Sequence, residues 1–163
     1  MTLKKPIAAL MLAVLLAACA QEAPEEAAAP VAPAVGSPLD PASIEFFRAE
    51  VGDRVLFATD SSRLDAVAQA TLGRQAAWLL DNPARNATIE GHADERGTRE
   101  YNLALGARRA AAVRAFLVAE GVPAARLRTV TFGKERPESL CSNESCWSQN
   151  RRGVTVMATA PTS

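Results

Sequence analysis

Donors for a metal site are scarce in this sequence, which has one histidine and three cysteines among 163 residues. Sites built from imidazole or thiolate ligands need three or four such side chains. Net charge is also lacking, because 18 Lys and Arg balance 18 Asp and Glu. Nucleic-acid binding, which depends on neutralising phosphates, is therefore not indicated. The sequence predicts one modest globular core with no metal site, no cofactor and no nucleic-acid partner.

Apolar runs long enough to cross a bilayer are missing as well. The run from Ile7 to Ala18 has only 12 residues and follows Lys4 and Lys5, as in a secretion signal. Its end, Leu16-Ala17-Ala18-Cys19, resembles the bacterial lipobox, in which the cysteine is acylated. We expect residues 1–18 to be a lipoprotein signal peptide and Cys19 to carry lipid that anchors the chain. The alternative is an ordinary signal peptide that a cysteine happens to follow.

The segment after Cys19 lacks the composition of a folded domain. Residues 20–41 hold five prolines and no aromatic side chain, so they cannot bury a core. In extended polyproline geometry they would reach up to roughly 70 Å. We expect residues 19–41 to be a lipidated cysteine with a disordered Ala/Pro/Glu tether, and residues 42–163 to be the domain. Alanine at position 20 resembles the outer-membrane sorting class of lipoproteins.

Two cysteines remain in the domain if Cys19 carries lipid. Cys141 and Cys146 would be oxidised in an exported protein. The ring they close is small, so it would stabilise the fold by at most about 2 kcal/mol. A catalytic or metal-binding dithiol is the competing interpretation, but it lacks a nearby histidine and the Cys-x-x-Cys spacing. We expect a local disulfide that closes a loop.

Helical and β-prone patterns alternate along the domain. Ser62 and Asp65 have capping-box spacing before the first long helical pattern, and Gly121 with Pro123 ends the second. The order strand, helix, strand, helix, strand, loop, strand predicts an α/β fold, an α+β sandwich, whose small mixed sheet carries its helices on one face. The expected strands are 53–58, 87–92, 128–132 and 154–159, and the expected helices are 43–51, 64–80 and 101–120.

Three polar side chains converge at the start of the second long helix. Arg109 falls inside the apolar arc of this helix, where a guanidinium needs a carboxylate or an equivalent partner. Asn102 lies two turns nearer the helix start, and Asp94 enters from the end of the preceding strand. Asp94 and Arg109 are either an internal ion pair or a clamp, in which Asp94 takes an ammonium and Arg109 grips a carboxylate.

Catalytic and metal sites are poorly supported near the same residues. Asp94 and Glu95 are adjacent, which is poor geometry for a cooperating acid and base. His92 with Asp94 supplies only two metal ligands, and two ligands do not make a site. No phosphate-binding glycine loop followed by lysine is present. The pattern therefore indicates binding rather than catalysis.

Several ordered motifs extend beyond these residues. They are Ile-Glu-Gly-His-Ala-Asp-Glu-Arg-Gly-Thr at 89–98, Tyr101-Asn102, Leu-Gly-Ala-Arg-Arg-Ala at 105–110, Phe-Gly-Lys-Glu-Arg-Pro at 132–137 and Asn150-Arg151-Arg152. Together they resemble the peptidoglycan-associated lipoproteins of the OmpA-like domain family, from residue 55 to about residue 157. The resemblance implies non-covalent binding of peptidoglycan through the meso-diaminopimelate of its stem peptide. It also implies partnership with the Tol envelope system of cell division, including its periplasmic propeller protein, at the outer membrane.

The resemblance also assigns roles to residues. Asp94 matches the acid that meets the free amine of diaminopimelate, and Arg109 matches the arginine that meets its carboxylate. Asn102 matches a pocket-lining amide. The remaining matches are a second basic contact, Arg152, and a pocket-edge strand motif, Phe57 and Asp60.

Two features depart from the family: Thr59 replaces a common aromatic side chain, and the loop from Cys141 to Cys146 is longer and crosslinked. Two alternative functions are also open. The chain could be a structural or protein-interaction lipoprotein without direct peptidoglycan binding, or a wall-modifying enzyme.

Overall fold

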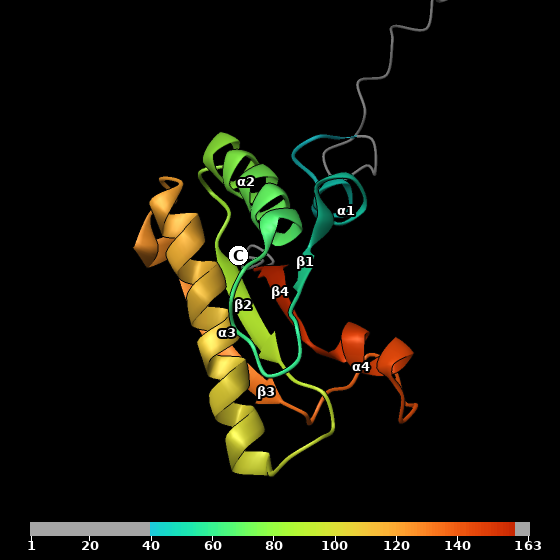
Figure 1. Ribbon diagram of the computed structural model, residues 1–163. Coiled ribbons are helices and arrows are strands. Elements are labelled where there is room, and N and C mark those ends of the chain that lie inside the picture. Colours follow the sequence, from blue (N-terminus) through green and yellow to red (C-terminus); the bar gives the residue numbers. More distant parts are fainter. Residues whose placement is uncertain (1–39, 159–163) are drawn as a thin grey trace, which may run out of the picture. The chain divides into compact units, whose positions relative to one another are not determined.

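The computed structural model describes residues 40–158 (Figure 1). The predicted signal peptide, Cys19 and nearly all of the predicted tether lie outside the described residues, as do residues 159–163. Between residues 40 and 158, no helix combines the length and apolar character that a membrane crossing requires.

The domain begins with a short helical segment that packs on the core. α1 (Ile44–Phe46) continues into the π-helix η1 (Phe47–Gly52), together close to the helix expected over 43–51. The Ser43 hydroxyl accepts a hydrogen bond from the Phe46 amide at 3.0 Å and so caps the start. Phe47 is fully buried, and its ring centroid lies 4.8 Å from that of Trp78. The segment therefore belongs to the folded domain.

The sheet has four strands in the order β1-β4-β2-β3. β2 and β3 are parallel, whereas β4 runs antiparallel to both β1 and β2. The predicted mixed sheet is therefore confirmed, although β1 is shorter than the expected strand over 53–58. The strands are β1 (Arg54–Leu56), β2 (Ala87–His92), β3 (Leu127–Gly133) and β4 (Arg152–Met157).

Two long helices cover one face of this sheet, as predicted (Figure 1). They are α2 (Ala66–Asp81) and α3 (Arg99–Ala119); a 3-10 turn, η2 (Ala124–Arg126), precedes β3. Leu72 of α2, Ile89 of β2 and Leu117 of α3 have no exposed surface. The core thus lies between the helices and the sheet.

The start of α2 differs from the expectation. Asp65, not Ser62, is the N-cap residue, and its carboxylate accepts a hydrogen bond from the Ala68 amide at 2.8 Å. A cap side chain satisfies an amide two or three residues ahead, and only Asp65 stands at that distance from the first helical turn. At α3 the Thr98 hydroxyl plays the same role for the Tyr101 amide.

Two glycines bring α3 into direct contact with the sheet. A Cβ atom on Gly91 would lie 1.8 Å from the Gly106 carbonyl oxygen, and one on Gly106 would lie 2.4 Å from the Thr131 hydroxyl. The backbones of β2 and α3 therefore touch at this point. This contact sets α3 against β2 and carries Arg109, one turn further along α3, over the end of the strand.

A short helix replaces part of the loop expected before the last strand. α4 (Glu144–Asn150) begins at Asn143, whose side chain accepts a hydrogen bond from the Ser145 amide at 3.0 Å. Seven residues are too few for the apolar periodicity that reveals longer helices in a sequence. In Figure 1, α4 lies well away from α2, beside the loop that joins β2 to α3.

Candidate ligand-binding pocket

A cavity of about 250 Å³ lies where β2 ends and α3 begins. Four of the six predicted binding residues line it: Asp60, Asp94, Asn102 and Arg109. A larger cavity of about 500 Å³ beside β1 and α2 contains none of the six. The remaining lining residues of the smaller cavity, here called the pocket, are Thr59, Arg96, Gly97, Tyr101 and Leu105.

Arg109 forms the floor of the pocket and has no exposed surface, as its place in the apolar arc of α3 predicts. Its guanidinium donates to the carbonyl oxygens of Ser61 at 2.8 Å, His92 at 2.7 Å and Ala58 at 3.1 Å. A guanidinium has five N–H donors, so two have no partner among residues 40–158. Burial lowers the pKa of Arg109 to about 10, and the side chain therefore stays charged at neutral pH.

Asp94 supplies the opposite charge and is also largely buried. Its carboxylate accepts hydrogen bonds from Arg96 Nη2 at 2.6 Å, from Arg96 Nε at 3.2 Å and from Arg151 Nη1 at 3.4 Å. Burial alone would raise the pKa of Asp94, but the hydrogen bonds from Arg96 and Arg151 outweigh it and lower the pKa. Among the described residues, Asp94 and Arg109 form no direct ion pair, so the simple internal brace is not what the structure shows.

Asn102 fixes the loop that carries Asp94. Its side-chain amide donates to the Arg96 carbonyl oxygen at 2.7 Å, and it is nearly fully buried. Gly97 adopts a φ of +85°, which an L side chain rarely takes and which lets the loop turn into α3. From β3's end, Lys134 donates to the carbonyl oxygens of Glu95 and Gly97. Hydrogen bonds from α3 and from the residue after β3 therefore both hold this loop.

Asp60 and Tyr101 lie together at the exposed edge of the pocket. The Tyr101 hydroxyl donates to the Asp60 carboxylate, which raises the pKa of Tyr101. Asp60 has a φ of +53°, the left-handed conformation that aspartate tolerates better than most residues. Thr59 lies beside it in the lining.

Phe57 lies beneath the pocket rather than in its lining. It is buried in the core, and its ring centroid is 5.1 Å from Arg109 Cζ. Phe57 therefore supports the floor through a cation–π contact and is not itself presented to a ligand.

Arg152 is not brought to the pocket, contrary to the expectation. It donates to the carbonyl oxygen of Arg136 at 3.2 Å and lies 3.5 Å from the Glu138 carboxylate. Successive side chains of a strand point to opposite faces, and because Gly153 faces the core, Arg152 faces away from the helices. Arg151, one residue earlier, is the member of the Asn-Arg-Arg motif that reaches Asp94.

Arg96 and Trp147 are contributors to which the sequence analysis gave no role. Arg96 lines the pocket, and its Cζ atom lies 4.2 Å from the ring centroid of Trp147 in α4. Arg96 lies within the motif at residues 89–98, and this position is the sequence feature that could have indicated its place in the pocket. Nothing local to Trp147 indicates the contact, because α4 and the loop are some 50 residues apart in sequence.

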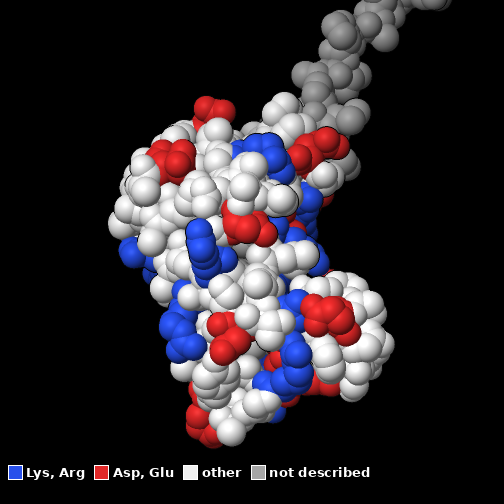
Figure 2. Space-filling model, in the orientation of Figure 1, with Lys and Arg blue, Asp and Glu red and all other residues white. Residues whose placement is uncertain are grey.

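The charges that line the pocket balance. Asp60 and Asp94 face Arg96 and Arg109, so the lining is neutral overall but strongly divided. Figure 2 shows acidic and basic side chains intermixed on this face, including where the projecting α4 region meets the body of the domain. No group of three metal-binding side chains occurs among residues 40–158. Such a lining suits a ligand with one positive and one negative group.

Known proteins share both this sequence and this fold. The model of the OmpA family matches residues 56–151. The chain belongs to the OmpA family. Within it, the peptidoglycan-associated lipoprotein of Rhizobium meliloti is 62% identical over 120 residues, 74% of this chain and 68% of that protein. That of Agrobacterium fabrum is 53% identical over 156 residues, 94% of this chain and 88% of that protein.

A solved structure agrees with these relatives. The crystal structure of the peptidoglycan-associated lipoprotein from Burkholderia pseudomallei is 41% identical, with a TM-score of 0.66, over 74% of this chain and 98% of that one. The resemblance to the peptidoglycan-associated lipoproteins and the predicted fold class are thereby confirmed.

Proposed function

We propose that this chain is a lipoprotein of the outer membrane that binds peptidoglycan non-covalently and is not an enzyme. The pocket holds the free end of meso-diaminopimelate in the stem peptide. Asp94 accepts the ammonium group, and Arg109 binds the carboxylate. The names of the relatives, peptidoglycan-associated lipoproteins, support the class of ligand.

The observation that carries the proposal is that Asp94 and Arg109 line one pocket without neutralising each other directly. Arg109 is fixed by three carbonyl oxygens, which carry no full charge, so its positive charge remains available to an anion. Two N–H donors without partners match a carboxylate, which accepts two parallel hydrogen bonds.

Access to Arg109 requires a local movement. Because Arg109 has no exposed surface, a carboxylate reaches it only after side chains of the pocket edge shift. The partly exposed Tyr101 is a lining side chain with the freedom to do so. Arg96 can stay on Asp94 while the ammonium binds, because a carboxylate has two oxygens with about four acceptor sites.

Attachment to the membrane and to partners is the remaining part of the proposal. Lipid on Cys19 holds the chain at the outer membrane, and residues 20–41 let the domain reach the cell wall. We further propose that the chain works with the Tol system, including its periplasmic propeller protein. The similarity to peptidoglycan-associated lipoproteins supports this role.

The test is calorimetric titration of the full chain, in detergent, with a soluble stem peptide that contains meso-diaminopimelate and with its lysine counterpart. The lysine peptide lacks the second carboxylate, so binding through Arg109 predicts strong preference for diaminopimelate. Asp94→Ala is expected to abolish binding. Equal affinity for both peptides, or unchanged affinity in Asp94→Ala, contradicts the proposed clamp.

Two further outcomes separate the alternatives. A structural or protein-interaction lipoprotein would give no heat with either peptide at any concentration. A wall-modifying enzyme would release muropeptides from isolated sacculi, and we expect no release. Arg152→Ala is a matched control, because Arg152 lies outside the pocket and its removal is expected to leave peptide binding unchanged.

A further inference from the structure

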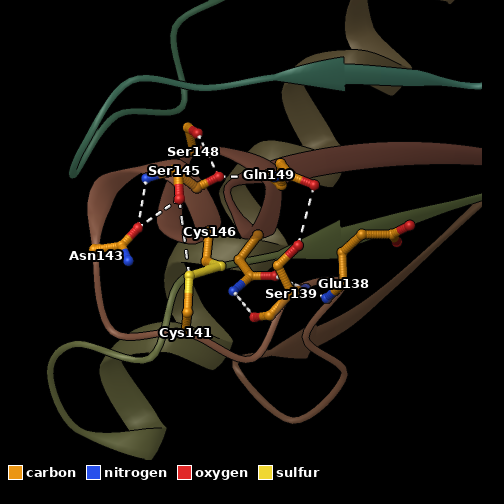
Figure 3. The surroundings of a disulfide bond; sticks show 9 residues. Glu138, Ser139, Cys141, Asn143, Ser145, Cys146, Ser148 and Gln149 are labelled. Atoms are coloured by element: carbon orange, nitrogen blue, oxygen red, sulfur yellow. Dashed lines mark hydrogen bonds between the residues drawn. A yellow bond between two sulfur atoms is a disulfide. The ribbon is translucent and has the colours of Figure 1, made fainter.

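The α4 region carries a crosslink that the proposed function does not use. Cys141 and Cys146 are joined by a disulfide, with their Cα atoms 5.6 Å apart, and the ring encloses the start of α4 (Figure 3). Inside the ring, Asn143 accepts hydrogen bonds from the amide and hydroxyl of Ser145. The disulfide, the helix cap and the first helical turn therefore form one unit.

The other end of α4 is fastened separately. Asn150 is buried, and its side-chain oxygen accepts hydrogen bonds from the amides of Glu138 at 2.7 Å and Ser139 at 3.0 Å. A helix of seven residues is not stable alone, so it depends on these attachments. The disulfide is the covalent attachment at its amino-terminal end, while Asn150 holds the end next to β4.

The disulfide ring, α4 and the residue after it contact three successive residues of the pocket loop, residues 93–98 between β2 and α3. Arg151, which follows α4, reaches Asp94 at 3.4 Å. The Ser142 side chain, inside the disulfide ring, is near enough to Glu95 to lower the pKa of the Glu95 carboxyl. The third contact is made by the ring of Trp147, which lies 4.2 Å from Arg96 Cζ. Residues 94–96 of the loop are thus contacted by α4 and by the residues on either side of it.

These contacts determine how the Asp94 carboxylate is held. Arg96 and Arg151 are the two side chains that bond it, and both contact α4, although the Phe57 carbonyl oxygen also accepts a hydrogen bond from Arg151 at 3.0 Å. Trp147 gives the Arg96 guanidinium a flat surface to lie on, and Glu144, in the first turn of α4, accepts a hydrogen bond from Arg151. If the first turn of α4 loosens, Trp147 and Glu144 move with it, so Arg96 loses its support and Arg151 loses one of its partners.

We propose that the Cys141–Cys146 disulfide positions Asp94 and Arg96 for the peptide, so that peptide binding weakens when the disulfide is reduced although the domain stays folded. This inference rests on the proposed function. Reduction by an external dithiol breaks the S–S bond, gives each sulfur one electron and one proton, and leaves the reductant as a disulfide. Trp147, Glu144 and Arg151 are positioning residues, because they act through Arg96 and Asp94.

The first experiment compares the oxidised and reduced full chain in detergent. Each is titrated with the stem peptide that contains meso-diaminopimelate, and reduction is expected to weaken binding roughly tenfold, the effect of about 1.4 kcal/mol. The double variant Cys141→Ser/Cys146→Ser should bind as weakly as the reduced chain, with or without dithiol. Equal affinity in the oxidised and reduced chains overturns the inference. No binding by the oxidised chain instead overturns the proposed function.

A second experiment tests the route through Trp147. Trp147→Phe keeps an aromatic surface beneath Arg96 and is expected to retain most of the affinity, whereas Trp147→Ala should lose about fivefold, as for one lost cation–π contact. The thermal midpoints of both variants, compared with wild type, verify that the fold is intact. The inference fails if the two variants bind equally well.

The dependence of peptide affinity on pH separates a positioning role from general destabilisation, which would not change the pKa of Asp94. Arg96 keeps the pKa of Asp94 low, so loosening Arg96 should raise that pKa. The loss of peptide binding on acidification is then expected at higher pH in Trp147→Ala and in the reduced chain than in the oxidised wild type. If Trp147→Ala, the reduced chain and the oxidised wild type all lose peptide binding at the same acidic pH, the positioning role is contradicted.

Discussion

The floor of the pocket and its α4 side hold charged groups in different ways. On the floor, Arg109 is fully buried and bonded to carbonyl oxygens from two segments of the chain. On the α4 side, Arg96 is partly exposed and rests on Trp147 of a seven-residue helix closed by a disulfide. Stability and binding are therefore inseparable at the floor, whereas at the α4 side they can be changed separately.

The largest effect is expected for Arg109→Ala. The substitution leaves three carbonyl oxygens without their donor and opens a cavity, at about 1–3 kcal/mol for each unsatisfied buried group. We expect the free energy of unfolding in denaturant to fall by about 3–5 kcal/mol, together with complete loss of peptide binding.

Asp94→Ala removes the negative charge of the pocket and is compared with Arg109→Ala. Arg96 is partly exposed and Arg151 still pairs with Glu144, so removal of Asp94 leaves little buried charge without a partner. Its loss of stability should be clearly smaller than that of Arg109→Ala, although binding is lost in both. Equal destabilisation by the two variants would erase the distinction between the floor and the α4 side.

Acid should destabilise the floor through His92, whose carbonyl oxygen holds Arg109. Burial, followed by the nearby Arg152, lowers the pKa of His92 from 6.5 to about 4. Between these pH values the unfolded chain binds the proton and the folded chain does not. The free energy of unfolding should therefore fall by about 3 kcal/mol as pH drops from 6.5 to 4.

The control for this pH dependence is His92→Gln, which does not titrate. Its unfolding free energy, measured in denaturant at each pH, should change less over the same range. The contribution of Asp94 is lost only at lower pH, because its pKa lies below 3.8. An identical pH dependence in wild type and His92→Gln would exclude His92 as the cause.

The two regions also differ in how far the sequence predicts them. The burial of Arg109 follows from its position in the apolar arc of a long helix, and the fold follows from the order of patterns. The partners of Asp94 were not predicted. They depend on where α4 lies, and a disulfide and a buried asparagine determine that rather than any local periodicity.

Arg151 and Arg152 illustrate the same limit. The Asn-Arg-Arg motif indicated a basic side chain at the pocket, and the resemblance assigned this role to Arg152, whereas Arg151 is the residue that contacts Asp94. Which arginine reaches Asp94 depends on where β4 begins, because a shift of one residue exchanges the two faces of a strand. Strand ends are set by tertiary contacts, which neither composition nor spacing reveals.

Gly106→Ala tests how closely the floor depends on the approach of α3 to β2. The new methyl group would lie 2.4 Å from the Thr131 hydroxyl and 2.7 Å from the Gly91 carbonyl oxygen. The helix must then move outward, which we expect to lower the free energy of unfolding by about 2 kcal/mol. Arg109 moves with it, so peptide affinity should fall. Gly73→Ala in α2 is the control, because its added methyl group meets no atom within 4 Å.

The smallest effect on stability is expected at the α4 side. The ring closed by Cys141 and Cys146 is short, so Cys141→Ser/Cys146→Ser should lower the free energy of unfolding by at most about 2 kcal/mol. Arg109 and its carbonyl partners lie outside the ring, so the floor should stay folded. Hydrogen exchange would show this: the amides of α4 should exchange faster in the double variant, while those of α3 and β2 keep their protection. Equal loss of protection in α3 would mean that the disulfide supports the core itself, and the separation of the two regions would be wrong.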